Sequence, residues 1–204
     1  MATNITITVP DWLDRICAWP MMAYRQWKYG YAFRKIDLGE GEWAIVDPQD
    51  YYWLNNFKWY LRGQGKKFYA IRSVKYGPGK TKESRMHREI MSAPAGLLVD
   101  HKDGNSLDNR RENLRLATHS QNACNSQINK TKSKSRFRGV CLDKSNGRWF
   151  STIRNHGKRI WLGYFDNEIE TAKAYDEAAR KYHGEFARLN FTESADSVQR
   201  SANS

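Results

Sequence analysis

The sequence has few of the features that mark an extracellular or membrane protein. It contains only three cysteines in 204 residues, an odd number, and no two of them form a CxxC pair. This argues against a disulfide framework and against a four-ligand zinc site. No apolar run approaches the roughly 20 residues that span a bilayer. Charged residues interrupt the N-terminal stretch, so it lacks the pattern of a signal peptide. These absences predict an intracellular, cytoplasmic protein with no membrane partner.

Acidic residues are also scarce relative to basic ones. The chain has 34 Lys and Arg against 22 Asp and Glu, which gives a net charge of +12. A protein this basic usually meets an anionic partner, and nucleic acid is the commonest. Charge alone leaves an anionic membrane surface and simple solubility open. The 13% aromatic content, with eight tryptophans, argues against a disordered basic tail.

The composition changes along the chain and predicts two domains. A helix can begin at Asp11, but Pro20 is expected to end it soon afterwards. The run Asn-Lys-Thr-Lys-Ser-Lys-Ser-Arg has no apolar residue, so we expect a linker that lies along phosphate. The predicted segments are 1–30, unassigned; 31–128, a first domain; 129–136, the basic linker; 137–191, a second domain; and 192–204, a disordered tail.

The first domain is expected to mix strands and short helices. Asp47-Pro48 is a typical helix start, because proline suits the first turn of a helix. Gly63 and Gly65 are expected in a turn between two strands. The expected strands are 43–46, 58–61 and 68–74, and a short helix is expected at 85–91.

The second domain has the pattern of three strands followed by one helix. Asn146-Gly147 is a strong hairpin signal between the first two strands. Asn167, with Glu170 three residues later, predicts a capping box at the start of the helix, and Gly184 is expected to end it. The expected strands are 138–143, 148–154 and 158–165. The fold class is therefore α+β, with a three-stranded antiparallel sheet packed on one helix in the second domain.

Side chains alternate between apolar and basic along the strands of the second domain. Residues two apart on a strand share a face. One face is apolar and suits the helix. The other is rich in arginine, which suits phosphate and guanine edges. The predicted DNA contacts are Arg138, Arg148, Arg154, Arg159 and Trp161. A solvated basic face is the alternative, but Trp161 would be costly to expose without a partner.

One polar segment of the first domain carries residues suited to chemistry. An apolar lead-in ends in adjacent Asp100 and His101, and a polar loop leads to Asn113. A short apolar strand and a helix that carries Asn122 follow. Neighbouring residues on a strand point to opposite faces. Asp100 and His101 must therefore lie at a strand end or a bend if they serve one site.

These residue types suit the hydrolysis of a phosphodiester, which needs a base for water and relief of negative charge. A neutral histidine such as His101 suits the base near pH 7. A divalent cation held by oxygen ligands suits the charge relief, and Asp100 and the Asn122 carbonyl are such ligands. Asn113 can fix the loop or the tautomer of the imidazole, and a role in bracing the loop alone stays open.

Several short motifs follow one another in this segment with a defined order and spacing. Asn113 lies 12 residues after His101, and Asn122 lies nine residues after Asn113. The motifs are Met86-His87-Arg88, Val99-Asp100-His101, Asp108-Asn109-Arg110, Glu112-Asn113-Leu114-Arg115 and Gln121-Asn122. The segment at 85–125 resembles the HNH endonuclease family, in the branch common among phage and intron-encoded nicking and homing enzymes. Residues 31–71 resemble the N-terminal half of such enzymes more loosely.

The HNH resemblance implies a fold and a set of roles. The fold would be a ββα-metal motif. Asp100 and Asn122 would bind Mg²⁺, or another divalent cation such as Mn²⁺. His101 would be the general base and Asn113 the orienting asparagine.

The second domain carries its own set of motifs. They are Arg138-Gly139-Val140, Trp149, Ile153-Arg154, Trp161-Leu162-Gly163-Tyr164-Phe165, Ala172 to Ala179, and Leu189-Asn190-Phe191. Residues 136–191 resemble the ethylene-response-factor (AP-two) DNA-binding domain, which also occurs fused to HNH nucleases. The resemblance implies a sheet in the major groove with the helix behind it. Plant members carry two further arginines where this chain has Cys141 and Asp143, so their GC-rich target does not carry over.

The other histidines have weaker assignments. His87 is expected to be a packed structural residue. His119 either contacts the scissile phosphate or metal or is solvated at a helix start. His156 and His183 are expected to be structural or to face phosphate.

Together these features predict a metal-dependent endonuclease that cuts double-stranded DNA, with homing or phage-genome functions. A monomer is favoured, and one active site would cut one strand. The main alternative is a non-catalytic, sequence-specific DNA-binding regulator that retains a degenerate HNH frame. A second alternative is an RNA-binding protein, although a rigid Arg-rich sheet favours duplex DNA.

Overall fold

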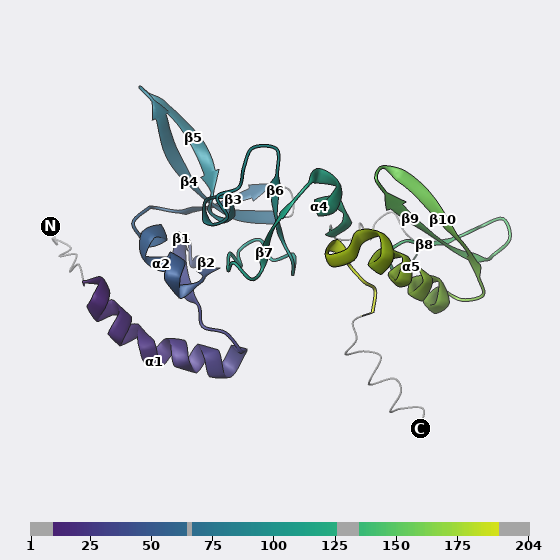
Figure 1. Cartoon of the computed structure of the whole chain (residues 1–204), viewed down its shortest axis with the longest axis horizontal. Coiled ribbons are helices and arrows are strands. Elements are labelled where there is room, and N and C mark those ends of the chain that lie inside the picture. The colour runs from purple at the N-terminus through teal and green to yellow at the C-terminus, as the bar shows by residue number, and fades with distance from the viewer. Residues whose placement is uncertain (1–9, 65–66, 126–134, 192–204) are drawn as a thin grey trace. The chain divides into compact units, whose positions relative to one another are not determined.

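The computed structural model describes residues 10–64, 67–125 and 135–191 (Figure 1). Most of the predicted linker, the whole predicted tail and Gly65 lie outside the described residues. The chain forms two compact units along its length. The first comprises residues 1–95 and 105–116, and the second comprises residues 96–104 and 117–204. Helices and strands occur in both units, so the predicted α+β class is confirmed. Among the described residues, no helix has the length and apolarity to cross a membrane.

The first unit is built from two small antiparallel sheets and three helices. Its elements in chain order are α1 (Asp11–Tyr29), β1 (Arg34–Gly39), β2 (Glu42–Val46), α2 (Pro48–Asn55), β3 (Tyr60–Gln64), β4 (Lys67–Gly77), β5 (Lys80–Arg85) and α3 (Met86–Ile90). Strands β1 and β2 pair with each other, and β4 lies between β3 and β5. Its core includes the fully buried side chains of Leu54, Met86 and Val46. Trp59 closes the end of α2, because its indole N–H donates to the Leu54 carbonyl at 2.8 Å.

The strand predictions for the first unit hold in part. The two strands expected at 58–61 and 68–74 are present as β3 and β4. The prediction for Gly63 is wrong, because this residue lies within β3 opposite Phe68. Strand β5 was not predicted. Its exposed, lysine-rich sequence has no apolar alternation, and it forms by pairing with the long strand β4.

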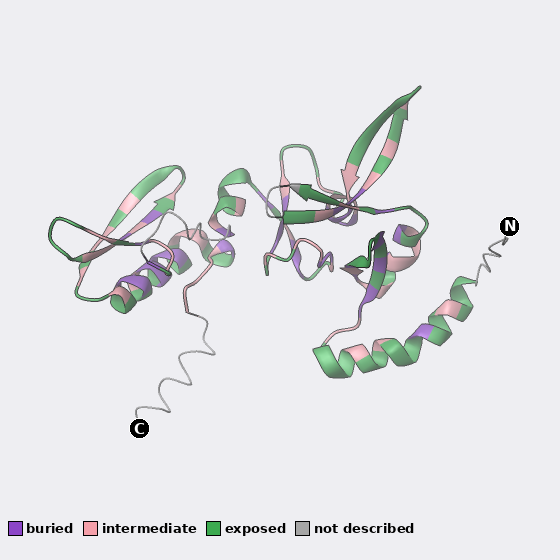
Figure 2. Cartoon of the chain, turned by 180° about the vertical axis from the view of Figure 1, so that it is seen from behind, coloured by how far each residue is buried: buried purple, intermediate pink, exposed green. Residues whose placement is uncertain are grey.

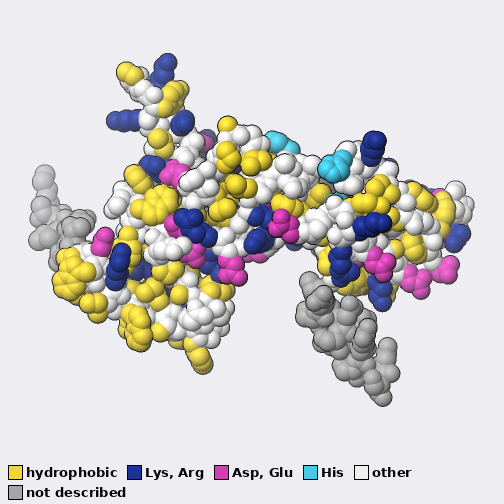
Figure 3. Space-filling view, in the orientation of Figure 1, with side chains coloured by type: hydrophobic (Ala, Val, Ile, Leu, Met, Phe, Trp, Pro, Cys, Tyr) yellow, Lys and Arg dark blue, Asp and Glu magenta, His cyan; other side chains and the backbone are white. Residues whose placement is uncertain are grey.

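The prediction that Pro20 would end the first helix is also wrong, since α1 continues through it to Tyr29. Pro20 is exposed, so the carbonyl that loses its N–H donor can bind water. The other side of α1 is fixed by tertiary contacts. Asp14 pairs with Arg34 at 2.9 Å, and the Arg15 guanidinium lies over the Tyr52 ring. The solvent side is rich in exposed hydrophobic residues, including Trp27, and Figure 3 shows hydrophobic side chains over α1.

The second unit begins with β6 (Leu98–His101). Strand β7 (Leu114–Ala117) lies at the boundary of the two units along the chain, and α4 (His119–Asn125) follows it. The chain order of β6, β7 and α4 is the strand–strand–helix order that the resemblance implies. The remaining elements are β8 (Val140–Leu142), β9 (Trp149–Asn155), β10 (Lys158–Phe165), α5 (Glu168–His183) and a 3₁₀ turn at Gly184–Phe186.

The last three strands form an antiparallel sheet in the order β10-β9-β8, and α5 packs on it as predicted. Ile153 of β9 is buried against Tyr175 and Ala179 of α5, and Ile160 and Leu162 of β10 pack on the same cluster. Figure 2 shows buried residues along α5, while its outer side is exposed. The predicted capping box is present, since the Asn167 side chain accepts from the Glu170 N–H at 2.9 Å.

A buried carboxylate attaches the end of the second unit to the start of its sheet. Asp176 on α5 accepts hydrogen bonds from the backbone N–H groups of Asn190 and Phe191, at 2.8 and 2.9 Å. The Asn190 side chain in turn accepts from the Arg138 N–H at 2.6 Å. This chain of contacts explains why the terminal Leu-Asn-Phe motif belongs to the domain.

Gly139 allows the close approach of α5 to the sheet. Its φ is +71°, and a Cβ there would overlap the Tyr175 ring. We expect Gly139→Ala to lower the free energy of unfolding by roughly 3 kcal/mol, because backbone strain and overpacking add. Gly147→Ala is the matched control, since its φ is +70° but no atom lies within 4 Å of the added Cβ. It should cost only about 1 kcal/mol. Urea unfolding followed by tryptophan fluorescence measures both, and equal losses would contradict the packing argument.

Candidate functional site

Asp100 and His101 lie at the end of strand β6, as the predicted site requires. Both are buried, with exposed fractions of 5% and 7%. The chain turns immediately after them, and the Gly104 N–H donates to the His101 carbonyl at 3.0 Å. Gly104 has a φ of +80°, a conformation that glycine adopts without strain. The strand end is therefore where two adjacent side chains can serve one site.

Asn125 connects this strand end to helix α4. Its Nδ2 donates to Asp100 Oδ1 at 3.1 Å and Oδ2 at 3.0 Å, and to the His101 carbonyl at 2.9 Å. Asn125 is itself buried, with an exposed fraction of 7%. A buried carboxylate needs such donors, because burial removes it from water. One amide group therefore holds both the carboxylate and the backbone of the catalytic candidates.

Helix α4 begins with a reciprocal cap. Thr118 Oγ1 accepts from the Gln121 N–H at 3.3 Å, and the Gln121 side chain accepts from the Thr118 N–H at 2.8 Å. Thr118 and Gln121 therefore cap the first turn of α4 for each other. Asn122 follows in α4, three residues before Asn125, and such residues share a helix face. Its side chain is half-buried, which places an amide on the face that contacts β6.

The residues of this strand end fit a hard divalent cation. Asp100 offers a carboxylate, which can accept more contacts than the two bonds from Asn125 because an ionised carboxylate has roughly four acceptor sites, and Asn122 offers an amide oxygen. Oxygen ligands of this kind suit Mg²⁺, which retains several waters and is held by one or two protein groups. No cluster of three or more His, Cys, Asp or Glu occurs in the described part of the chain. The expected pair of one aspartate and one asparagine does not need such a cluster.

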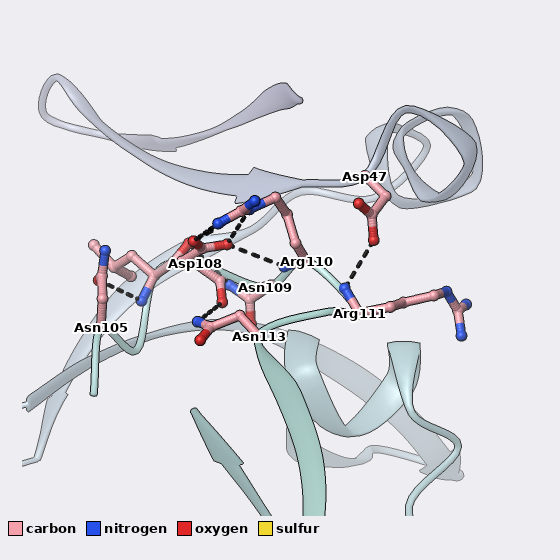
Figure 4. Close-up of polar contacts among 8 residues, drawn as sticks. Asp47, Asn105, Asp108, Asn109, Arg110, Arg111 and Asn113 are labelled. Atoms are coloured by element: carbon pink, nitrogen blue, oxygen red, sulfur yellow. Dashed lines mark hydrogen bonds and ion pairs between the residues drawn. The ribbon is translucent and has the colours of Figure 1, made fainter. Parts of the chain in front are cut away.

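Asn113 belongs to the first unit, where it braces a polar loop (Figure 4). Its Nδ2 donates to the Asp108 carbonyl at 2.9 Å. The Asp108 carboxylate accepts from Arg110 Nη2 at 2.6 Å and from Arg110 Nε at 2.9 Å. This hydrogen bond raises the pKa of Arg110, and the guanidinium also covers the Tyr31 ring at 3.4 Å. The loop-bracing role that the sequence left open for Asn113 is thus present.

The same loop is attached to the edge of strand β2 and to helix α2. The Ile45 N–H donates to the Leu107 carbonyl at 2.8 Å, and the Asn109 N–H donates to the Ile45 carbonyl at 2.7 Å. Arg111 makes a bidentate ion pair with Asp50, with both N–O distances at 2.7 Å. The hydrogen bond with Asp50 raises the pKa of Arg111. These contacts make the segment before Asn113 a rigid part of the first unit.

The remaining histidines lie in different settings. His87 is buried at the start of α3 with its ring 5.5 Å from that of Tyr69, which suits the packed role that was expected. His183 Nε2 lies 2.9 Å from the Arg154 carbonyl. His156 is exposed in a turn with a φ of +46°, and His119 is exposed at the start of α4.

The outer face of the C-terminal sheet carries most of the predicted DNA contacts. Arg148, Arg154, Arg159 and Trp161 are all exposed. Trp161 is 51% exposed although its ring stacks on Phe150 with the centroids 4.9 Å apart. Arg154 and Arg159 are direct partners in the β9–β10 register. Like charges directly opposite on a sheet destabilise it, so a polyanion on this face would relieve a repulsion.

Arg138 and Asp143 differ from the rest of this face. Arg138 is half-buried; burial raises the pKa of the nearby Tyr175 phenol, while the positive charge of Arg138 acts to lower it. Asp143 accepts hydrogen bonds from Ser145 and from the Tyr164 hydroxyl, the latter at 2.7 Å. These bonds, with that from Ser145 the strongest, lower the Asp143 pKa to about 2. Asp143 therefore keeps its charge and braces the hairpin turn.

Sequence reasoning missed Asn125 and the role of Asp50. The signal for Asn125 was its spacing, because it follows Asn122 by one helical turn. Asp50 had no local signal, since its partner Arg111 lies 61 residues away.

Comparisons with known proteins match both parts of the chain. The family model described as HNH endonuclease matches residues 92–124, and the one described as AP2 domain matches residues 135–185. An uncharacterized HNH endonuclease of Acanthamoeba polyphaga mimivirus is 32% identical over 164 residues, which cover 78% of this chain and 80% of the relative. Dehydration-responsive element-binding protein 2D of Arabidopsis thaliana is 46% identical over 70 residues, covering 33% of this chain and 34% of that protein. Dehydration-responsive element-binding protein 2A of Arabidopsis thaliana is 48% identical over 64 residues, covering 30% of this chain and 19% of that protein.

The brace at Asn113 generates a stability prediction. Asn113→Ala leaves the loop without the bond to the Asp108 carbonyl, so we expect the free energy of unfolding to fall by about 1–3 kcal/mol. The control is Asn105→Ala in the same loop, because Asn105 is exposed and its side chain accepts from the Leu107 N–H at 3.1 Å at the solvent-facing surface. It should cost less than about 1 kcal/mol. Thermal unfolding monitored by circular dichroism compares the two variants. An Asn113→Ala variant as stable as wild type would contradict the bracing role of Asn113.

Proposed function

The chain belongs to the HNH endonuclease family and carries an AP2 domain, and from this premise we propose that it is a metal-dependent nuclease that hydrolyses phosphodiester bonds in double-stranded DNA. The observation that carries the proposal is the buried Asp100–His101 pair at the end of β6, fixed to α4 by Asn125. A regulator that had lost catalysis would have no need to maintain a buried carboxylate beside a histidine, which costs stability. The HNH frame is therefore best explained by chemistry.

His101 is the proposed general base. A neutral imidazole can take a proton from water near pH 7. The backbone carbonyl of His101 accepts hydrogen bonds from the Gly104 N–H and from Asn125. The main chain from which the imidazole extends is therefore fixed in position. A ring nitrogen of His101 would accept the proton as water attacks phosphorus.

Asp100 and Asn122 are the proposed ligands of a divalent cation, Mg²⁺ or a similar ion such as Mn²⁺. When bound, the cation would offset the negative charge that develops on the phosphate and on the leaving oxygen. Asp100 supplies the charged oxygen, and its burial keeps the carboxylate in one orientation. Asn122 supplies a neutral oxygen from α4. Asn113 stays proposed as the orienting asparagine, acting through the braced loop.

The AP2 domain is proposed to supply DNA affinity through the outer face of its sheet. The arginines there suit phosphate and guanine edges, and the Trp161–Phe150 pair offers an apolar surface. Because Arg138 is half-buried whereas the other four candidates are exposed, it is proposed to contribute less than they do. A DNA substrate also implies that the protein acts inside a cell.

The first functional prediction concerns His101. The full chain should convert supercoiled plasmid to open-circular or linear product with Mg²⁺ but not with EDTA. His101→Ala should slow this at least about a hundredfold, because loss of a general base costs two to four orders of magnitude. Gel electrophoresis over time gives the rates. Arg180→Ala, on the exposed side of α5, is the control and should cut at the wild-type rate.

The result also separates the nuclease from the binding-only alternative. Equal cleavage by wild type and His101→Ala would overturn the proposed mechanism. Binding without cleavage, on both plasmid and the DNA that surrounds the gene, would favour a regulator.

The second functional prediction concerns the sheet face. Arg159→Ala or Trp161→Ala should weaken duplex DNA binding roughly tenfold or more, since one good base or phosphate contact is lost. Arg180→Ala removes the same charge from the exposed side of α5, so it serves as the control and should have little effect. Fluorescence anisotropy at two salt concentrations measures affinity, with RNA duplex as competitor. Stronger binding to RNA, or equal losses in Arg159→Ala and Arg180→Ala, would count against the proposal.

A further inference from the structure

Two asparagines one turn apart on α4 have different surroundings. Asn125 makes three hydrogen bonds to β6 and is buried. Asn122 is only half-buried, so its side chain stays in part accessible to solvent. A metal ligand needs a side-chain oxygen that an ion can reach, whereas a positioning residue is itself held by hydrogen bonds. Asn122 suits the first role, and Asn125 suits the second.

We propose that Asn125 is a positioning residue that orients Asp100 for the metal and holds His101 at the reacting centre. The inference rests on the proposed function and adds a residue to it. The Asn125 amide contacts both oxygens of Asp100 at 3.0–3.1 Å, so it fixes the plane of the carboxylate. An ionised carboxylate has roughly four acceptor sites, so the two bonds from Asn125 do not by themselves exclude a cation. Groups that orient a ligand in this way change metal affinity or activity by about 10- to 100-fold.

The same amide links the carboxylate and the histidine. Its third bond goes to the His101 carbonyl at 2.9 Å. A shift of Asn125 would therefore move the metal ligand and the base together. The backbone of Asn125 is also held, because Arg188 Nη1 donates to its carbonyl at 3.3 Å. Asn125 thus has an anchored main chain and a side chain directed at the strand end.

The test compares three variants of the full chain. Asn125→Ala removes the donor, and Asn122→Ala removes the proposed ligand. Asn125→Asp keeps the shape of the side chain but places a second carboxylate against Asp100. The affinity for Mn²⁺ is measured without DNA by electron paramagnetic resonance of the free ion. Plasmid cleavage gives kcat and KM, and circular dichroism gives the melting temperature.

We expect Asn125→Ala to bind Mn²⁺ at least about tenfold more weakly, with kcat reduced and KM for DNA unchanged. Its melting temperature should fall, because Asp100 loses buried donors. Asn122→Ala should also bind Mn²⁺ more weakly but keep its melting temperature. Asn125→Asp should have a lower kcat than wild type whatever its Mn²⁺ affinity, since its carboxylate repels Asp100 and cannot donate to the His101 carbonyl.

A destabilised control separates positioning from stability alone. Gly139→Ala lowers stability away from Asp100, so its Mn²⁺ affinity should equal that of wild type. If Asn125→Ala lost stability but kept wild-type Mn²⁺ affinity and kcat, the positioning role would be overturned. The two proposals fail differently. An inactive wild type whose Mn²⁺ affinity still depends on Asn125 would retain the positioning role and remove the nuclease.

Discussion

A carboxylate buried beside a histidine is the constraint on which the candidate site of the second unit depends. Taking Asp100 out of water costs several kcal/mol unless hydrogen bonds replace its hydration. Asn125 provides them to both oxygens, and it holds the His101 carbonyl as well. The bonds that make burial tolerable are therefore the bonds that join α4 to β6. A site with two proposed protein ligands has little redundancy, so its geometry must come from such supporting contacts.

Much of the fold could be predicted from local patterns. The strand alternation around Ile153, the capping box at Asn167 and the reciprocal cap at Thr118 each depend on residues within a few positions of one another. Such local patterns can be read from the sequence, because the residues that interact are close together along the chain. The strand-end position of Asp100 and His101 followed from the same logic, since adjacent side chains can meet only where the strand stops.

The rest depends on contacts between distant residues. Helix α1 passes Pro20 because its inner side is held by Arg34 and Tyr52 rather than by local propensity. The loop before Asn113 is rigid because Asp50 binds Arg111. No local sequence pattern at either residue predicts this ion pair. Strand β5 exists because β4 is long enough to pair with it. In each case tertiary packing overrides a weak local preference, which a single sequence does not reveal.

The AP2 sheet and the HNH frame solve complementary problems in the proposed enzyme. An outer sheet face with Arg154 opposite Arg159 is repulsive in the free protein, and phosphate neutralises it on DNA. That face therefore gains most from a polyanion and can hold the chain on a duplex. The HNH residues, by contrast, are buried and few, so they offer the substrate little binding surface of their own. Tethering converts their encounter with the phosphodiester into an intramolecular event at a raised effective concentration. Affinity can then be set by the sheet without altering the geometry that Asn125 imposes on Asp100.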